Sequence, residues 1–153
     1  MDREHSALFA KKYLEDLLSF FGVNIDVSTH VSDDVIELKI PSTHLNGFLI
    51  GTKGDTLRSI QYLVSTTLKN KQAELYRTNI DIADYKAHRA ERLIKNLQDT
   101  FQKVLQDGES QALEPMNPAD RRVVHQAMQE YPELESHSEG EGRDRHIVIS
   151  KRS

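Results

Sequence analysis

Two glycines on either side of a polar pair, Gly51-Thr52-Lys53-Gly54, constrain this chain more than any other feature. They follow a short apolar helix predicted over residues 46–50, and a longer amphipathic helix is predicted to begin at Asp55. Glycine has no Cβ, so the backbone here can approach another molecule closely. The free N–H groups at the start of the next helix attract phosphate. The pattern predicts a loop that holds a nucleic-acid backbone, although paired glycines also occur in ordinary tight turns.

The predicted contact residues of this loop are Ile50, Gly51, Thr52, Lys53 and Gly54. Lys53 supplies one positive charge for a phosphate, and Thr52 supplies a hydroxyl group. Neither side chain reads a base, because contacts to phosphate position a strand without reporting its sequence. Binding at this loop is therefore expected to depend on backbone geometry. In the mechanism we expect, Ile50, Leu57 and the neighbouring strand line an apolar groove for the bases.

The first half of the chain alternates between helical and strand periodicity. Apolar spacing predicts a first helix over residues 6–21, with Leu8, Leu14, Leu17, Leu18 and Phe21 on one stripe. Period-two alternation predicts strands over 23–31 and 35–40, joined as a hairpin through the turn at 32–34. Helices over 46–50 and 55–69 and a strand over 75–82 follow. The second of these helices is expected to bury Leu57, Ile60, Val64 and Leu68, with Leu63 beside them.

A domain boundary is expected near residue 83, where the third strand passes into a long helix over 84–106. We therefore predict one domain over residues 1–83 and a second over 84–153. The second is expected to hold a short strand over 112–116, a helix over 118–130 and a hairpin of strands over 134–138 and 145–151. Asn117 can cap the helix, Pro118 suits its first position, and Asp120 favours its positive end.

Arg121 and His125 form a second candidate site on that helix. They are four residues apart, so both project from one helical face. Both can donate hydrogen bonds to phosphate oxygens, and arginine can do so with two nitrogens. Taken alone, the pair fits a solvated helix face better, because Arg and His often occur at this spacing by chance. Lys86, Arg89 and Arg145 are weaker candidates, because charge on a helix face or beside a turn usually serves solvation.

Composition narrows the classes of function. The net charge is −4, so a uniformly basic surface cannot attract nucleic acid over a long range. The chain has no cysteine, which excludes disulfides and thiolate metal sites. No signal peptide or membrane-spanning apolar run is visible, which predicts a soluble cytoplasmic protein. The histidines lack metal-ligand spacing, and Gly54 is followed by Asp55 rather than by Lys-Ser/Thr, so no enzyme activity, metal or cofactor is predicted.

The two motifs in this order resemble a known family. Residues 47–57 (GFLIGTKGDTL) and 61–64 (QYLV) closely resemble the KH domain of the bacterial Jag family, also called the SpoIIIJ-associated or KhpB family. Arg121 and His125 match the family's R3H domain, as do residues 114–118 before that helix and 136–142 and 145–149 after it. The resemblance covers nearly the whole chain, but the N-terminal Jag-N domain of many members is not expected here.

The resemblance implies an α+β protein with two parts. The first is a type II KH domain of order αββααβ, with a three-stranded sheet packed by helices. The second is a small α+β R3H domain. It further implies a non-catalytic protein that binds single-stranded RNA, or single-stranded DNA. Such a protein acts as a post-transcriptional regulator or RNA chaperone affecting cell elongation and division, with a small single-KH partner of the KhpA type.

One rival interpretation stays open beside it. The acidic net charge favours an assembly module that binds another protein or a ribosomal particle, with RNA binding incidental. A metal-dependent nuclease that uses the histidines is a second rival, and a chelator test on RNA cleavage would separate it from the non-catalytic interpretation.

Overall fold

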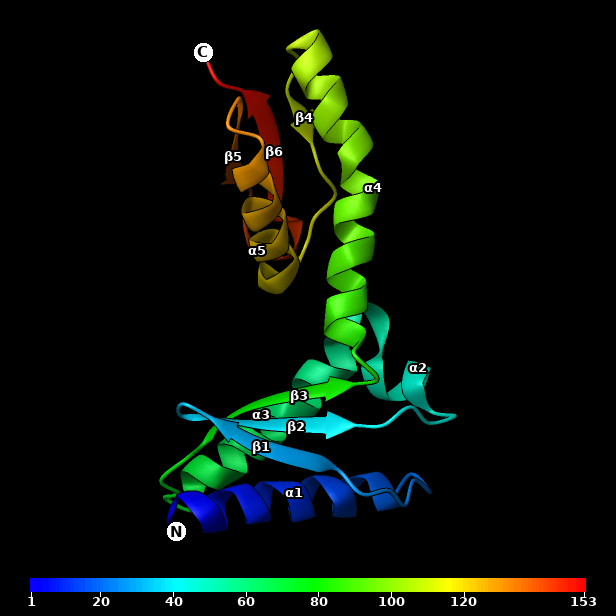
Figure 1. The fold of residues 1–153 in the computed structure, drawn as a ribbon, viewed down its shortest axis with the longest axis vertical. Coiled ribbons are helices and arrows are strands. Elements are labelled where there is room, and N and C mark those ends of the chain that lie inside the picture. The colour runs from blue at the N-terminus through cyan, green and yellow to red at the C-terminus, as the bar shows by residue number, and fades with distance from the viewer. The chain divides into compact units, whose positions relative to one another are not determined.

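The computed structural model describes all 153 residues. The chain divides into two compact units, Met1–Lys86 and Ala87–Ser153, each with its own hydrophobic core. Each unit holds one three-stranded sheet, so the fold is α+β, as the sequence predicts (Figure 1).

The first unit has the element order αββααβ of the type II KH fold, with the glycine loop between its second and third helices. Its elements are α1 (Arg3–Ser19), β1 (Ser28–Ser32), β2 (Val35–Ile40), α2 (Asn46–Ile50), the 3-10 turn η1 (Thr52–Gly54), α3 (Asp55–Asn70) and β3 (Arg77–Ile82). The sheet order is β1-β2-β3, with β1 antiparallel and β3 parallel to β2.

The core of the first unit lies between this sheet and the helices α1 and α3. Alternate strand residues point into it, among them Ile36, Leu38, Ile80 and Ile82, which are all fully buried. The buried residues of α3 are the four that the sequence predicts, Leu57, Ile60, Val64 and Leu68. The spacing of the apolar residues was therefore sufficient to orient this helix.

Three predictions for the first unit need correction. The first helix spans Arg3–Ser19 rather than 6–21, and Leu14 and Leu18 are buried as predicted, together with Ser6 and Ala10. Leu8 and Phe21, also predicted to face the core, are 58% and 43% exposed. The first strand is shorter than predicted: residues 23–27 are not in a strand, although Val23 and Val27 are buried. Leu63 is about half exposed rather than packed beside the core residues of α3.

The second unit contains most of α4 (Tyr85–Asp107), followed by β4 (Gln111–Ala112), α5 (Pro118–Ala127), η2 (Met128–Glu130), β5 (Leu134–Glu139), η3 (Gly142–Asp144) and β6 (His146–Lys151). Its sheet order is β4-β6-β5, all antiparallel. Phe101 of α4, Val124 of α5 and the β6 residues Ile147 and Ile149 are fully buried at its centre. The predicted strand over 112–116 is in fact two residues long and one position earlier.

Candidate nucleic-acid interface

Gly51 closes α2 in a conformation that only glycine adopts without strain. Its φ is +74° and its ψ is −174°, and its N–H group donates to the carbonyl oxygen of Gly47 over 2.9 Å. A Cβ at this position would lie 2.3 Å from Oγ1 of Thr56 and 2.8 Å from its Cβ. Because real side chains do not approach so closely, the backbone of the loop is held against the first turn of α3 by the absence of a side chain.

Gly54 closes the other side of the loop and caps α3. Its φ is +79°, and no side chain caps the start of this helix. Lys53 also has a positive φ, +53°, and its carbonyl oxygen accepts a hydrogen bond from Nη1 of Arg58 over 2.9 Å. Thr52 and Lys53 themselves are exposed. The loop therefore presents two polar side chains on a fixed backbone, beside a helix start without a side-chain cap.

The apolar residues beside the loop belong to the core. Ile50 is half-buried and packs against it, whereas Leu57 is 2% exposed and part of it. The expectation that Leu57 lines a surface groove for bases is therefore wrong, since its side chain is needed inside the unit. Ile50 keeps an exposed portion next to Gly51.

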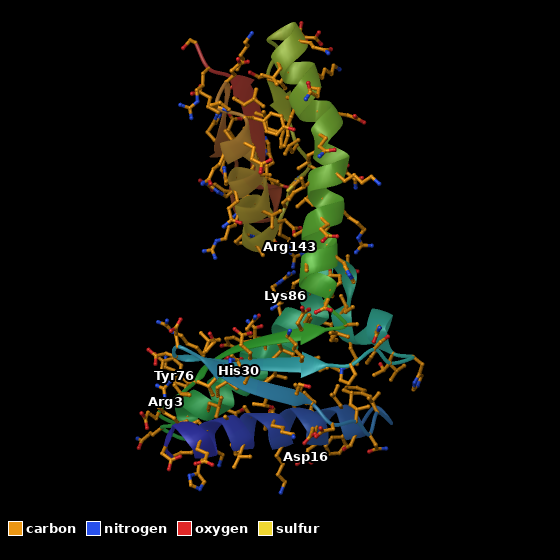
Figure 2. The ribbon with its side chains drawn as sticks, in the orientation of Figure 1. Arg3, Asp16, His30, Tyr76, Lys86 and Arg143 are labelled. Carbon is orange, nitrogen blue, oxygen red and sulfur yellow. The ribbon has the colours of Figure 1, made fainter.

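Lys86 lies beside the sheet at the start of α4 (Figure 2). Its ammonium group donates to Oε1 of Gln61 on α3 over 3.2 Å and to the side-chain oxygen of Asn79 on β3. Burial lowers the pKa of Lys86 from its usual range, opposed by the nearby carboxylates of Asp81 and Glu37. The charge of Lys86 is thus held by amide oxygens at the edge of β3, between that strand and α3.

The segment that carries the loop differs in charge from the rest of the chain. Between residues 38 and 80 there are six basic residues and only two acidic ones, Asp55 and Glu74, while the whole chain has a net charge of −4. The local electrostatics of the loop are therefore more favourable to a phosphate backbone than the total charge suggests.

In the second unit, the beginning of α5 organises the predicted Arg121 and His125 pair. Asn117 caps the helix, its side-chain oxygen accepting from the N–H group of Asp120 over 2.9 Å. Nη1 of Arg121 donates to the carbonyl oxygen of Met116 over 2.6 Å, and Nδ1 of His125 lies 2.6 Å from Oγ of Ser136 on β5. The two side chains lie on one face of α5, where they line an open hollow with Pro118, Arg122, Gln126 and Gln129.

Arg89 has a different partner from the one predicted. Its Nε and Nη2 donate to the two carboxylate oxygens of Asp120 over 3.1 and 2.6 Å, and Asp120 is buried. This two-point ion pair holds α4 to α5 and commits the guanidinium group of Arg89 to the fold. Sequence reasoning assigned Asp120 only to the helix start, because the pairing joins residues 31 positions apart.

Arg145 is exposed beside the turn before β6. Its Nη1 donates to the carbonyl oxygen of Gly140 over 3.0 Å, and its own carbonyl oxygen accepts from the N–H group of Met116 over 3.4 Å. Met116 is also the residue that Arg121 contacts, so both arginines lie at the end of the second unit where α5 begins. Figure 2 labels Arg143, in the same turn, at this end.

Two further residues belong to these surfaces and were missed by sequence reasoning. Arg58 reaches back to the glycine loop, and Ser136 contacts His125 from another element. Ser136 belongs to residues 136–142, which resemble the R3H domain, but that resemblance does not indicate that its hydroxyl group contacts His125.

No group of three or more histidine, aspartate or glutamate side chains is arranged to hold a metal ion. No helix has both the length and the apolar content that crossing a bilayer requires.

Comparison with known proteins adds two findings. Residues 90–151 match the R3H domain. The chain is 32% identical over 142 residues to RNA-binding protein KhpB of Clostridium symbiosum, covering 92% of this chain and 64% of the relative. It is 28% identical over 148 residues to RNA-binding protein KhpB of Streptococcus pneumoniae serotype 2, covering 97% of this chain and 45% of the relative. It is also 28% identical over 143 residues to RNA-binding protein KhpB of Bacillus subtilis, covering 92% and 68%. The chain therefore spans less than two thirds of the length of the first two relatives.

Proposed function

Because the chain belongs to the Jag family of KH and R3H proteins, we propose that it binds single-stranded RNA at two sites without cleaving it. The observation that carries this proposal is the loop Gly51–Gly54. It combines an obligatory glycine, two exposed polar side chains and a helix start without a side-chain cap, in the basic part of an acidic chain.

At the first site, the backbone of Gly51, Thr52 and Lys53 receives the sugar-phosphate backbone of the strand, whereas Gly54, a predicted contact residue, is buried beside the side chains of Arg58 and Tyr85 and turns the chain into α3. The N-terminal end of α3 and the ammonium group of Lys53 supply positive potential. Ile50 offers its exposed portion to a base, and Lys86 lies at the edge of β3 as a further donor. A loop of this kind holds about four nucleotides with little regard to base identity.

At the second site, Arg121 and His125 grip phosphate oxygens from one face of α5. Both side chains are already positioned, Arg121 by Met116 and His125 by Ser136, so less conformational entropy is lost on binding. Arg145 adds a positive charge at the same end of the unit. Arg89 is left out of this site because Asp120 holds its guanidinium group.

For the whole protein, we assign the KH domain to residues 1–83 and the R3H domain to residues 84–153. We further propose a cytoplasmic post-transcriptional regulator or RNA chaperone that influences cell elongation and division. Its protein partner is a small single-KH protein of the KhpA type. The domain assignment is supported by the division into two compact units and by the R3H match over residues 90–151. The cellular role, the location and the protein partner rest on the family resemblance alone.

A titration of labelled single-stranded RNA against the full chain tests the first site. The variant Thr52→Asp/Lys53→Asp places like charge before the phosphates and is expected to weaken binding by about tenfold or more. Both positions are exposed, and aspartate tolerates the positive φ of Lys53. Lys12→Asp/Asn24→Asp changes the net charge equally at exposed positions away from the loop and is the matched control. Equal weakening by both variants would show that total charge, not the loop, governs binding.

The second site is tested by Arg121→Gln/His125→Gln, with the exposed Lys103→Gln on α4 as the control. Glutamine keeps a hydrogen-bonding side chain at each position and removes the positive charge of Arg121, the same change in charge as in the control. We expect several-fold weaker binding in the double variant only. If it binds RNA as tightly as the parent protein, the α5 face is not a binding site.

The absence of catalysis is tested by incubating RNA with the protein, with and without a chelator. We expect intact RNA in both cases, and metal-dependent cleavage would contradict the non-catalytic assignment.

One observation favours a protein contact as a second function. Phe20 is 86% exposed, and the rings of Phe21 and Phe48 meet edge to face with centroids 5.3 Å apart, both partly exposed. Aromatic side chains are enriched where proteins bind one another. Phe20→Ala/Phe48→Ala is expected to weaken capture of a purified single-KH partner without changing RNA binding, and unchanged capture would remove this surface from the interface.

A further inference from the structure

The outward face of α3 carries a line of basic and aromatic side chains that lie outside the hydrophobic core. Arg58, Tyr62 and Lys69 are separated by four and seven residues, so they lie in one row along the helix. The opposite face of α3 supplies the core residues, and Tyr76 follows shortly before β3. We call Arg58, Tyr62, Lys69 and Tyr76 the tyrosine stripe.

Contacts at both ends make the stripe continuous with the glycine loop. At one end, Nη1 of Arg58 donates to the carbonyl oxygen of Lys53 in the loop over 2.9 Å. At the other end, Nζ of Lys69 lies 5.8 Å from the ring centroid of Tyr76. The helix rises about 16 Å between Arg58 and Lys69. Tyr76 comes directly before β3, and Figure 2 labels it at one end of the sheet.

The rings of the stripe are accessible. Tyr62 is 70% exposed and Tyr76 is 42% exposed, so an aromatic surface is available to a planar ligand group. The hydrogen bonds that join α3 to β3 come from other side chains, Gln61 and Ser65, which contact Ile80 and Thr78. Neither tyrosine ring is needed for that packing, and neither is part of the core.

The charge along the stripe suits a polyanion. Residues 56–73 contain three basic side chains and no acidic one, within a chain whose net charge is −4. Of the three, Lys71 lies over the ring of Phe9, with Nζ 5.4 Å from its centroid, and so belongs to the α1 side. The guanidinium group of Arg58 forms an ion pair with the carboxylate of Asp55 on the same helix. Lys69 is therefore the cation that stands on the stripe without a carboxylate partner.

We infer that the tyrosine stripe extends the first RNA site beyond the glycine loop. Bases that leave the loop stack on Tyr62 and then on Tyr76, and Lys69 contacts the phosphate between them. Alternating rings and cations are typical of surfaces that bind single strands without reading their sequence. The stripe carries the cations Arg58 and Lys69, and residues 56–73 include no acidic side chain, so a negatively charged phosphate backbone is the ligand that we propose for it. The inference rests on the proposed function, and it makes the strand bound at the first site longer than the roughly four nucleotides that the loop holds.

The experiment compares two RNAs of about four and about twelve nucleotides. Tyr62→Ala is expected to weaken the longer RNA by roughly 5- to 100-fold, as expected for loss of one stacked base, and to leave the shorter RNA nearly unchanged. Tyr62→Phe keeps the ring and is expected to keep the affinity. Phe20→Ala removes an exposed aromatic ring elsewhere in the same unit and is the matched control. For charge, Lys69→Gln is compared with Lys71→Gln, and only Lys69→Gln is expected to weaken the longer RNA.

Tyrosine fluorescence gives a second readout, because the chain contains five tyrosines and no tryptophan. Stacked bases quench a tyrosine, so the longer RNA is expected to quench the parent protein more than the Tyr62→Phe variant. If Tyr62→Ala binds the longer RNA as the parent does, or weakens both RNAs equally, the stripe is not an extension of the site. In that case the proposed function would still hold if the Thr52→Asp/Lys53→Asp variant binds RNA more weakly than the parent protein. A parent protein that binds neither RNA would overturn both.

Discussion

Replacing Gly51 with alanine tests the central geometric argument about the loop. The new Cβ would lie 2.3 Å from Oγ1 of Thr56, 2.8 Å from its Cβ and 2.9 Å from its backbone nitrogen. Two of these atoms are fixed by the start of α3 and cannot rotate away. The backbone at φ +74° and ψ −174° is also in a region that is essentially restricted to glycine. The substitution must therefore move the loop or the first turn of α3.

The expected cost combines the two effects. Backbone strain of this kind costs about 1–3 kcal/mol, and overpacking against fixed atoms costs a further 1–3 kcal/mol or so. We expect Gly51→Ala to lower the free energy of unfolding of the first unit by about 2–6 kcal/mol. Gly54→Ala is expected to cost about 1–2 kcal/mol, because its nearest neighbours are the ends of the Arg58 and Tyr85 side chains at 3.3 Å, which can shift. Gly47→Ala, with open space around it, is expected to stabilise α2 by up to about 1 kcal/mol.

Urea unfolding followed by residue-specific amide NMR measures these differences, because two units can unfold in separate transitions. The signals of Leu38 and Ile80 report the first unit, and that of Ile147 reports the second as an internal control. The order Gly51, then Gly54, then Gly47 is the essential result. A Gly51→Ala protein within about 0.5 kcal/mol of the parent would refute the argument that the loop requires glycine there. In the Gly51→Ala background, Thr56→Ala should restore only part of the loss.

Three other outcomes follow from the structure. Arg89→Ala leaves the buried carboxylate of Asp120 without its partner and is expected to destabilise the second unit by about 3–5 kcal/mol in urea unfolding. The control Arg92→Ala, at an exposed site on the same helix, should stay within about 0.5 kcal/mol of the parent. Asp2 caps α1, and its hydrogen bonds from the backbone and ring of His5 lower the pKa of its carboxyl group. The stability it contributes is present above its ordinary pKa and lost as pH falls through the lowered value, so Asp2→Ala should destabilise the first unit near neutrality and have a smaller effect in acid, as measured by urea unfolding at the two pH values. RNA affinity should fall with salt with a logarithmic slope of only about −3, from about four cationic phosphate contacts, at Lys53, Lys69, Arg121 and Arg145. A slope several times steeper in a salt titration would indicate an extended basic surface instead.

The elements of both units could be predicted from the sequence where apolar periodicity was long and uninterrupted. The helices α3 and α4 lie within one or two residues of their predicted ranges, and α5 begins at Pro118 as its capping residue Asn117 indicates. The strand predicted over residues 23–31 was too long. Alternating apolar residues there do face the core, but the hydrogen bonds of the β1-β2 ladder begin only at Ser28. Burial pattern and strand pairing are different properties, and sequence alternation reports the first.

The candidate site was predictable in part for the same reason. The glycine loop and the Arg121 and His125 pair are local patterns, so their positions in the sequence are enough to find them. Arg89 shows where this reasoning fails. Its place on a polar helix face made it a candidate for phosphate, but its actual partner is a buried carboxylate on another helix. Nothing near Arg89 in the sequence indicates that pairing.

The sequence alone determined the element order, the glycine loop and the spacing of the second motif, because these depend on backbone conformation and helical period over a few residues. Only the tertiary structure decided which charged side chains remain available. In this structure Arg89 pairs with Asp120, Leu57 lies in the core, and Tyr62 is exposed on the outward face of α3. Burial and pairing are set by contacts between segments distant in the chain, and a periodic pattern cannot specify which of several similar side chains makes each contact.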